Sequence, residues 1–186
     1  MTTPANLTAL VGGRVIDPAN GFDGIADVVC GDGKVLAVGS GVAATYLDAD
    51  RIDCTNLIVT PGLIDLHVHV YPGLGNFCVT PDQAGVERGV PIVVDGGTSG
   101  TATMQLALDW LDAAQPKTKV LSFMDPCVLY LATHDFICHK LEIANDTRNL
   151  DLDAAAELLE LHADRIVGFK VRACHTGDPE VSPFLE

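Results

Sequence analysis

Two histidines lie two residues apart in the apolar stretch Pro61-Gly62-Leu63-Ile64-Asp65-Leu66-His67-Val68-His69. Side chains alternate across a strand, so Asp65, His67 and His69 are expected on one face, with their apolar neighbours packed on the other. Two imidazoles on one face can hold a single metal ion, and the Asp65 carboxylate can orient one of the rings. The pattern predicts a metal site at His67 and His69. The alternative is a pair of histidines on an exposed strand that bind nothing.

A second position with chemical potential is Lys170, which lies in the apolar run 166–171. A lysine inside a buried parallel strand has to be paired or chemically modified, because an isolated ammonium is costly to bury. The alternative is a side chain that extends along the sheet until its ammonium group reaches water at the rim.

Three further residues are candidates for lining a substrate site. Tyr71 and Asn76 follow directly after the histidine pair, and Asp95 ends an apolar run. Asp95 either lines the site or caps the turn that follows. That turn, the stretch 96–100, has the composition of an anion-binding loop, but it lacks a phosphate-binding lysine, and a tight strand-to-helix turn is the favoured interpretation.

Residues 1–60 are expected to form a small all-β piece. Asp32-Gly33 between two apolar runs is a strong hairpin signal, and Gly12-Gly13 is expected to separate two strands. The short strand-like runs are 8–11, 14–16, 26–30, 34–38 and 57–59.

Residues 61–186 are expected to alternate strands and helices. The expected strands are 63–70, 90–94, 120–123 and 166–171, and the expected helices are a short one capped by Thr80 and Gln83, the run 101–114, and one from Asp151 or Asp153 to His162. Repeated strand–helix units imply a parallel sheet with right-handed crossovers. The predicted fold class is α/β: part of a small β-sandwich followed by about four of the eight βα units of a TIM-type barrel.

Hydrophobic spacing predicts which sides of these elements are buried. The strands are almost wholly apolar, which is typical of strands covered on both faces. On the helices, Met104, Ala107, Leu108 and Leu111 share one face, and Leu158 and Leu161 are expected to point inward.

Taken together, the segments 59–69, 12–18 and 167–173 resemble the amidohydrolase superfamily of metal-dependent hydrolases. The first looks like its first barrel strand with the H-x-H pair, and the second like the small β-sandwich that precedes the barrel. The third, with the turn 93–100, is similar to the dihydroorotase-related amidohydrolase/deacetylase branch. The resemblance runs from about residue 7 to residue 180.

The resemblance implies roles for the matched residues. His67 and His69 would bind the more buried of two divalent metals, usually zinc, and Lys170 would be carboxylated and bridge both ions. A metal-bound hydroxide would cleave a cyclic amide, an N-acyl or an O-acyl bond, so the expected partner is a small-molecule amide or ester. The resemblance does not distinguish dihydroorotase-like substrates from deacetylase-like substrates.

The resemblance also implies residues that this sequence lacks. In the superfamily the other metal-binding histidines come from the fifth and sixth strands and the catalytic aspartate from the eighth, which would lie beyond Glu186. No catalytic residue is therefore expected within the chain, and we expect it to be inactive alone. To be active, the chain would need the missing residues from a homo-oligomer or from a missing C-terminal half. The alternatives are a non-catalytic half-barrel partner and one half of a split enzyme.

Composition excludes some partners. The formal net charge is −14 at pH 7, from 11 basic and 25 acidic residues. Such a chain repels phosphate backbones, so nucleic acid is not an expected partner. No apolar run predicts a membrane span, and the scattered cysteines indicate reduced thiols. The expected location is the cytoplasm.

Overall fold

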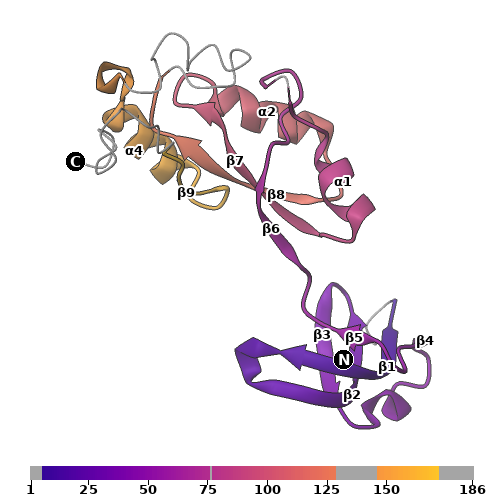
Figure 1. The fold of residues 1–186 in the computed structure, drawn as a ribbon. Helices are drawn as coiled ribbons and strands as arrows, with labels where there is room; N and C mark the ends of the chain where they lie inside the picture. Colours follow the sequence, from indigo (N-terminus) through magenta and orange to yellow (C-terminus); the bar gives the residue numbers. More distant parts are fainter. Residues whose placement is uncertain (1–5, 76, 129–145, 172–186) are drawn as a thin grey trace. The chain divides into compact units, whose positions relative to one another are not determined.

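The computed structural model of the chain describes residues 6–75, 77–128 and 146–171 (Figure 1). The chain divides into two compact units, Met1–Pro61 and Gly62–Glu186. Each unit contains one β-sheet of its own. The architecture is α/β, with a mixed sheet in the first unit and a parallel sheet in the second, which we call sheet A and sheet B.

Sheet A has five strands in the order β3-β2-β1-β4, with β5 also paired to β1. β1 pairs with β2 antiparallel and with β4 and β5 in parallel, and β2 pairs with β3 antiparallel. The strands are β1 (Thr8–Asp17), β2 (Phe22–Gly31), β3 (Lys34–Gly39), β4 (Asp50–Asp53) and β5 (Ile58–Val59), and the short 3₁₀ helices are η1 (Pro18–Asn20) and η2 (Val42–Thr45).

The turn signals of the first unit are partly confirmed. Asp32 and Gly33 have φ angles of 50° and 71° and join β2 to β3, as the hairpin signal predicted. The expected break at Gly12-Gly13 was wrong, because β1 continues through it. Its register against β2 shifts between Leu10 and Gly13, and Gly12 has a φ of 74°. Gly12 therefore lies in a bulge within one long strand, and Gly13 pairs regularly with Ala26.

Only one sheet is found among the described residues of the first unit. One apolar cluster packs Ala43 of η2 against Ala9 and Val29, and a separate cluster joins Val15, Ala26 and Val28. The predicted second layer of a β-sandwich is not present in this part of the chain, where η2 takes part in the first cluster instead.

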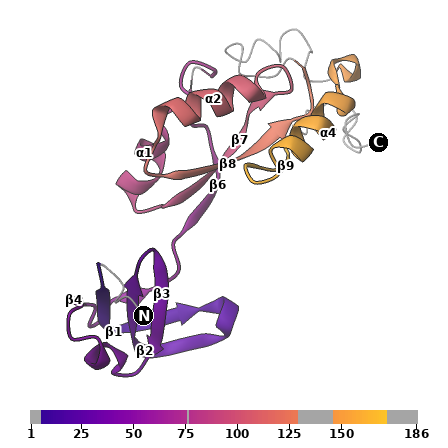
Figure 2. The same cartoon turned by 180° about the vertical axis from the view of Figure 1, so that it is seen from behind.

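Sheet B has four strands in sequential order, β6-β7-β8-β9, all parallel (Figures 1 and 2). Its strands are β6 (Ile64–Val68), β7 (Ile92–Gly100), β8 (Lys119–Asp125) and β9 (Ile166–Phe169), and its helices are α1 (Pro81–Ala84), α2 (Met104–Ala114) and α4 (Leu152–Leu161), with 3₁₀ turns η3 (Val86–Arg88) and η6 (Thr147–Asn149). Sequential parallel strands joined by helices are the expected product of repeated strand–helix units.

The helix starts follow local sequence signals. Thr80 and Gln83 form the predicted capping box at α1, and Pro81 occupies its first turn. The Asp151 side chain accepts a hydrogen bond from the backbone N–H of Ala154 at 3.0 Å, which caps α4. Both caps satisfy backbone donors that have no partner within the helix.

Helix α2 packs against sheet B with the predicted face. Met104, Ala107, Leu108 and Leu111 are its buried residues, and they belong to the two apolar clusters beneath the helices. In α4 the prediction holds for Leu158, which packs on the second cluster. It was wrong for Leu161, which is 67% exposed in the last turn.

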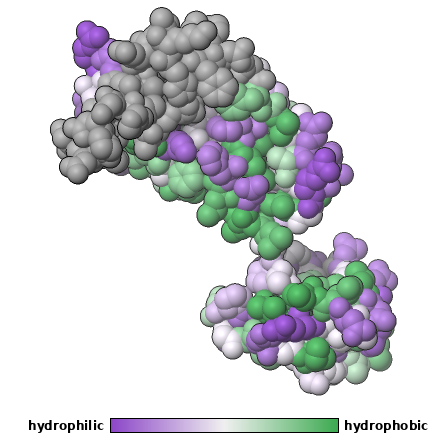
Figure 3. All heavy atoms as spheres, in the orientation of Figure 1, coloured by the Kyte–Doolittle hydropathy of each residue, from purple (hydrophilic) through white to green (hydrophobic). Residues whose placement is uncertain are grey.

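The prediction that the strands of sheet B are buried on both faces holds for β7, which is buried from Val93 to Gly100, and was wrong for the outer strands β6 and β9. Ile64, Leu66 and Phe169 are 53%, 63% and 44% exposed, whereas Val93, Met124 and Ile166 are buried beside the helices. Figure 3 shows hydrophobic residues at the molecular surface. In the part of the chain that the structure describes, the helices that connect the strands all lie on the same face of sheet B.

No helix in that part of the chain is both long and apolar enough to cross a bilayer.

Candidate metal and active site

A cavity of about 280 Å³ lies at the carboxyl ends of the strands of sheet B. Its polar lining groups are the His67 imidazole and the Lys170 amine, and the rest of its lining is Leu66, Gly96, Phe123, Phe169 and Val171. These residues come from or directly follow all four strands. Carboxyl ends of parallel strands meet at one edge of a sheet, which is where α/β proteins bind and transform ligands.

Strand β6, which contains His67 and is followed directly by His69, contains an irregularity. Asp65 pairs with Val93, but Val68 pairs with Asp95, so β6 has one more residue than β7 between these two pairs. The Asp65 carboxylate, which we expected to orient an imidazole ring, accepts the backbone N–H of His67 at 3.0 Å. Bulges of this kind re-aim a side chain and often lie beside active sites. Asp65 therefore acts on His67 through the backbone.

The two imidazoles lie close together. The ring centroids of His67 and His69 are 5.5 Å apart, with an interplanar angle of 67°. With metal–nitrogen bonds of about 2.0–2.1 Å, two imidazole centroids on one ion are separated by at most ~6.5 Å. The observed separation falls within that limit, so the pair fits a shared ion. His67 is exposed and His69 is half-buried.

Two glycines provide the space that His67 and Lys170 occupy. A Cβ on Gly96 would lie 2.3 Å from Cδ2 of His67, and a Cβ on Gly97 would lie 2.6 Å from Cβ of Lys170. Gly97 also has a φ of 84°, which disfavours any other residue. The stretch 96–100, expected to be a turn, is part of β7, and the absence of side chains at Gly96 and Gly97 leaves room for the His67 ring and the Lys170 stem.

His69 is linked to β7 by a chain of hydrogen bonds. Its Nδ1 lies 2.7 Å from Oγ1 of Thr98, and that hydroxyl lies 2.8 Å from Oδ2 of Asp95. The ring of Phe77 packs edge-on against the His69 ring at a centroid distance of 4.7 Å. Sequence reasoning missed Thr98; the Asp-x-x-Thr spacing after an apolar run was the available signal.

Asp95 is buried and accepts several hydrogen bonds. It is 0% exposed, and it accepts the backbone N–H groups of Val70 at 2.9 Å and Thr98 at 2.6 Å. Burial raises the pKa of the Asp95 carboxyl, and the hydrogen bonds from Thr98 and Val70 oppose that rise. The carboxylate thus braces β6 against β7 directly behind the histidine pair.

The other substrate-lining candidates are placed differently. Tyr71 is 1% exposed within the core beneath α2, and its hydroxyl lies 2.6 Å from Oγ of Ser122. Its ring contacts Trp110 edge-on at 6.3 Å. This placement favours packing over substrate contact. Asn76 lies outside the described residues.

The donor set in the described residues is incomplete. No group of three His, Cys, Asp or Glu side chains gathers there in a way that could hold an ion. The available groups are two imidazoles and the Lys170 amine, which becomes an oxygen donor only as a carbamate. Cys78 lies near Thr98, with its Sγ 4.0 Å from Oγ1, but burial raises the pKa of its thiol and disfavours the ligating thiolate.

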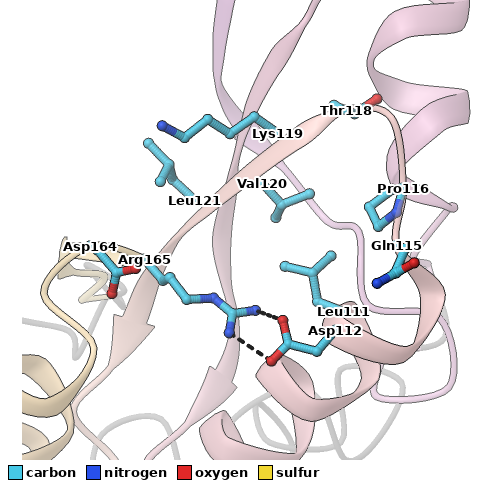
Figure 4. Close-up of a pocket in the computed structure, with 10 residues that line it drawn as sticks. All are labelled: Leu111, Asp112, Gln115, Pro116, Thr118, Lys119, Val120, Leu121, Asp164 and Arg165. Atoms are coloured by element: carbon cyan, nitrogen blue, oxygen red, sulfur yellow. Dashed lines mark hydrogen bonds and ion pairs between the residues drawn. The ribbon is translucent and has the colours of Figure 1, made fainter.

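A larger cavity of about 570 Å³ lies at the amino ends of β8 and β9 (Figure 4). The guanidinium of Arg165 forms a two-point ion pair with Asp112, at 2.9 and 3.0 Å. Lys119 and Asp164 also line this cavity. The charges of the central pair are satisfied within the protein, so this cavity offers no comparable set of metal ligands.

Comparison with known proteins identifies relatives. A deacetylase of Agrobacterium fabrum is 33% identical over 158 residues, which are 84% of this chain and 37% of the relative. A dihydroorotase of Citrifermentans bemidjiense is 56% identical over 64 residues, or 34% of this chain and 15% of the relative. No protein-family profile matches the chain.

Solved structures show the same fold. The crystal structure of a dihydroorotase matches with a TM-score of 0.74 and 27% identity, over 91% of this chain and 43% of that one. An adenine deaminase structure shares the fold, with a TM-score of 0.68 and 22% identity over 87% of this chain and 40% of that one. The chain spans about two fifths of the length of the deacetylases that it matches.

Proposed function

We propose that this chain, a homologue of the hydrolytic enzymes named deacetylase and dihydroorotase, carries part of the metal site of an amidohydrolase-type hydrolase. The reaction class is metal-assisted hydrolysis of a small-molecule cyclic amide, N-acyl or O-acyl bond. The single observation that carries the proposal is the cavity that brings His67 and Lys170 together, although they are more than a hundred residues apart in the chain.

Three side chains would hold the metal. His67 and His69 would donate imidazole nitrogens to one divalent ion, and Lys170, as a carbamate, would donate oxygens to that ion and to a second one. When bound, such ions lower the pKa of a water molecule and polarise the carbonyl of the substrate. Zinc suits imidazole and carboxylate-type donors, although other divalent ions accept them too.

The surrounding residues have supporting roles. Asp65 holds the backbone of His67, and Gly96 and Gly97 keep space open for the His67 ring and the Lys170 stem. Phe123 and Phe169 line the same cavity as Lys170.

We further propose that sheet B is part of a (β/α)₈ barrel. The repeating unit of that fold is a parallel strand followed by a helix, and the described residues contain four such strands in sequential order. The exposed apolar side chains of Leu66 and Phe169 would then line the barrel interior, and further metal ligands would come from polypeptide beyond the described residues.

The test is metal binding by the intact chain, measured by native mass spectrometry and by competition with a zinc chelator. His67→Asn and His69→Asn are each expected to weaken zinc binding by more than about 100-fold, since changes outside the ligand set already cost about 10–100-fold. His162→Asn is the matched control, because that imidazole bonds to Gln105 on the helix side. Equal zinc affinity in all three variants would contradict the proposal.

The carbamate is tested separately. Labelled bicarbonate should give a carbamate carbon signal in the chain with metal, and Lys170→Gln should remove it, whereas Lys119→Gln should not. Lys119 lines the cavity at the opposite end of the sheet and serves as the control. A carbamate signal that persists in Lys170→Gln would overturn the role of Lys170.

A further inference from the structure

We propose that Thr98 and Asp95 are positioning residues that fix the tautomer of His69 so that its Nε2 faces the metal. The inference rests on the proposed function for its metal, but the tautomer itself is a property of the metal-free chain. The observation is a chain of two hydrogen bonds, in which Oγ1 of Thr98 lies 2.7 Å from Nδ1 of His69 and 2.8 Å from Oδ2 of Asp95.

The direction of the hydrogen bonds follows from counting protons. An ionised carboxylate only accepts, so the single hydroxyl proton of Thr98 is donated to Asp95. Oγ1 of Thr98 is then an acceptor toward His69, and Nδ1 must carry the ring proton. A neutral imidazole protonated at Nδ1 presents its lone pair at Nε2, which is one of the two nitrogens through which histidine binds metals.

The carboxylate form of Asp95 is supported by its backbone contacts. Its Oδ1 accepts the N–H of Thr98 at 2.6 Å, and its Oδ2 accepts the N–H of Val70 at 2.9 Å. Backbone donors on both oxygens stabilise the charged form and leave Oδ2 in place to accept the Thr98 hydroxyl. A protonated Asp95 would reverse the chain and put the proton on Nε2 of His69.

The same carboxylate holds His69 at two points. It accepts the backbone N–H of Val70, the residue directly after His69, and it holds the ring through Thr98. Both contacts come from β7, across a register in which Val68 pairs with Asp95. The backbone and the ring of His69 are therefore oriented by one buried group, which reduces the rotational freedom lost on metal binding.

The test compares Thr98→Val with Thr98→Ser. Serine keeps the hydroxyl, and valine keeps the shape without it. In the metal-free chain, ¹⁵N spectra of the imidazoles, assigned to His69 with the His69→Asn variant, should show the Nδ1–H tautomer in the parent chain and in Thr98→Ser. Thr98→Val should shift the ring toward the Nε2–H tautomer and weaken zinc binding by about 10–100-fold, with serine restoring both.

The outcomes separate this inference from the proposed function. An Nε2–H tautomer in the parent chain, or an unchanged tautomer and zinc affinity in Thr98→Val, overturns the inference and leaves the metal site standing. A parent chain that binds no zinc overturns the proposed function, and the tautomer in Thr98→Val still decides whether Thr98 fixes the ring. Should Thr98→Val fail to fold, Thr98→Ala and the parent spectrum give the same decision.

Discussion

The two ends of sheet B differ in how they use their polar groups. At the amino end, a cavity of about 570 Å³ is lined by Lys119, Asp164 and the Arg165–Asp112 pair. At the carboxyl end, a cavity of about 280 Å³ brings His67 and Lys170 together within apolar walls. The larger cavity is therefore not the better candidate for chemistry.

The difference lies in what the polar groups bind. Arg165 is paired with Asp112 and also donates to the backbone carbonyl of Leu108 at 3.3 Å, so it ties α2 to the start of β9. At the other end, the buried side chains of Asp95 and Thr98 hold the imidazole of His69, the proposed metal ligand, in place. In (β/α)₈ barrels the carboxyl ends of the strands carry the active site, and the opposite end contributes to stability.

The largest expected effect is at the glycine beside Lys170. Gly97→Ala puts a non-glycine residue at a φ of 84° and a Cβ within 2.6 Å of Lys170 Cβ. We expect a loss of about 2–4 kcal/mol in the free energy of unfolding, from left-handed strain and overpacking together, and weaker zinc binding. Denaturant unfolding and the chelator competition measure the two effects.

Gly89→Ala is the matched control for that variant. Gly89 has a φ of 78° but no atom within 4 Å of an added Cβ. It should lose only about 1–2 kcal/mol of stability and keep the zinc affinity of the parent chain. Equal losses of stability and zinc affinity in both variants would show that Gly97 makes no special room for Lys170.

An intermediate effect is expected at Tyr71, which lies two residues after His69. Tyr71→Phe removes the 2.6 Å hydrogen bond to Ser122, whose hydroxyl is buried. A buried hydroxyl that loses its partner costs about 1–3 kcal/mol. The unfolding free energy at neutral pH should fall by that amount. An unchanged free energy of unfolding would show that the hydrogen bond between Tyr71 and Ser122 does not stabilise the fold.

The same variant carries a pH test. Burial raises the pKa of Tyr71 from 10.0 to about 12. Between pH 10 and pH 12 the unfolded chain loses this proton and the folded chain keeps it, so stability is lost as pH rises through that window. Tyr71→Phe should remove this part of the alkaline loss. Absorbance titration of the tyrosines, with and without Tyr71, measures the shift directly.

The smallest effect is expected at the amino end. The side chains of Arg165 and Asp112 are 22% and 65% exposed, so Asp112→Asn should cost no more than about 1 kcal/mol, and less at high salt. Zinc affinity should not change. If the loss of this ion pair also lowered the zinc affinity, the two ends of the sheet would be coupled and would not have separate roles.

Several features could be predicted from the sequence because they depend on neighbours in the chain. The capping box at Thr80, the cap at Asp151 and the buried face of α2 are set by spacings of three or four residues. The His67–His69 pair is local in the same sense. The α/β class with a parallel sheet follows from repeated units of this kind.

Other features could not be predicted because they depend on how strands pair. The sequence predicted alternation along β6 and burial on both faces of the sheet, but the extra residue between Asp65 and Val68 and the one-sided helix layer are tertiary outcomes. Leu161 shows the same limit: its spacing is helical, yet its side chain is 67% exposed in the last turn of α4.

What the sequence determined by itself is the set of reactive groups and the strands that carry them: His67 and His69 near the end of one strand and Lys170 near the end of another. Only the tertiary structure decided that Lys170 shares a cavity with His67 and that Thr98 and Asp95 hold His69. The physical reason is register. Contacts between residues 29 or more positions apart exist only after β6, β7, β8 and β9 align, and that alignment is set by the packing of the whole sheet.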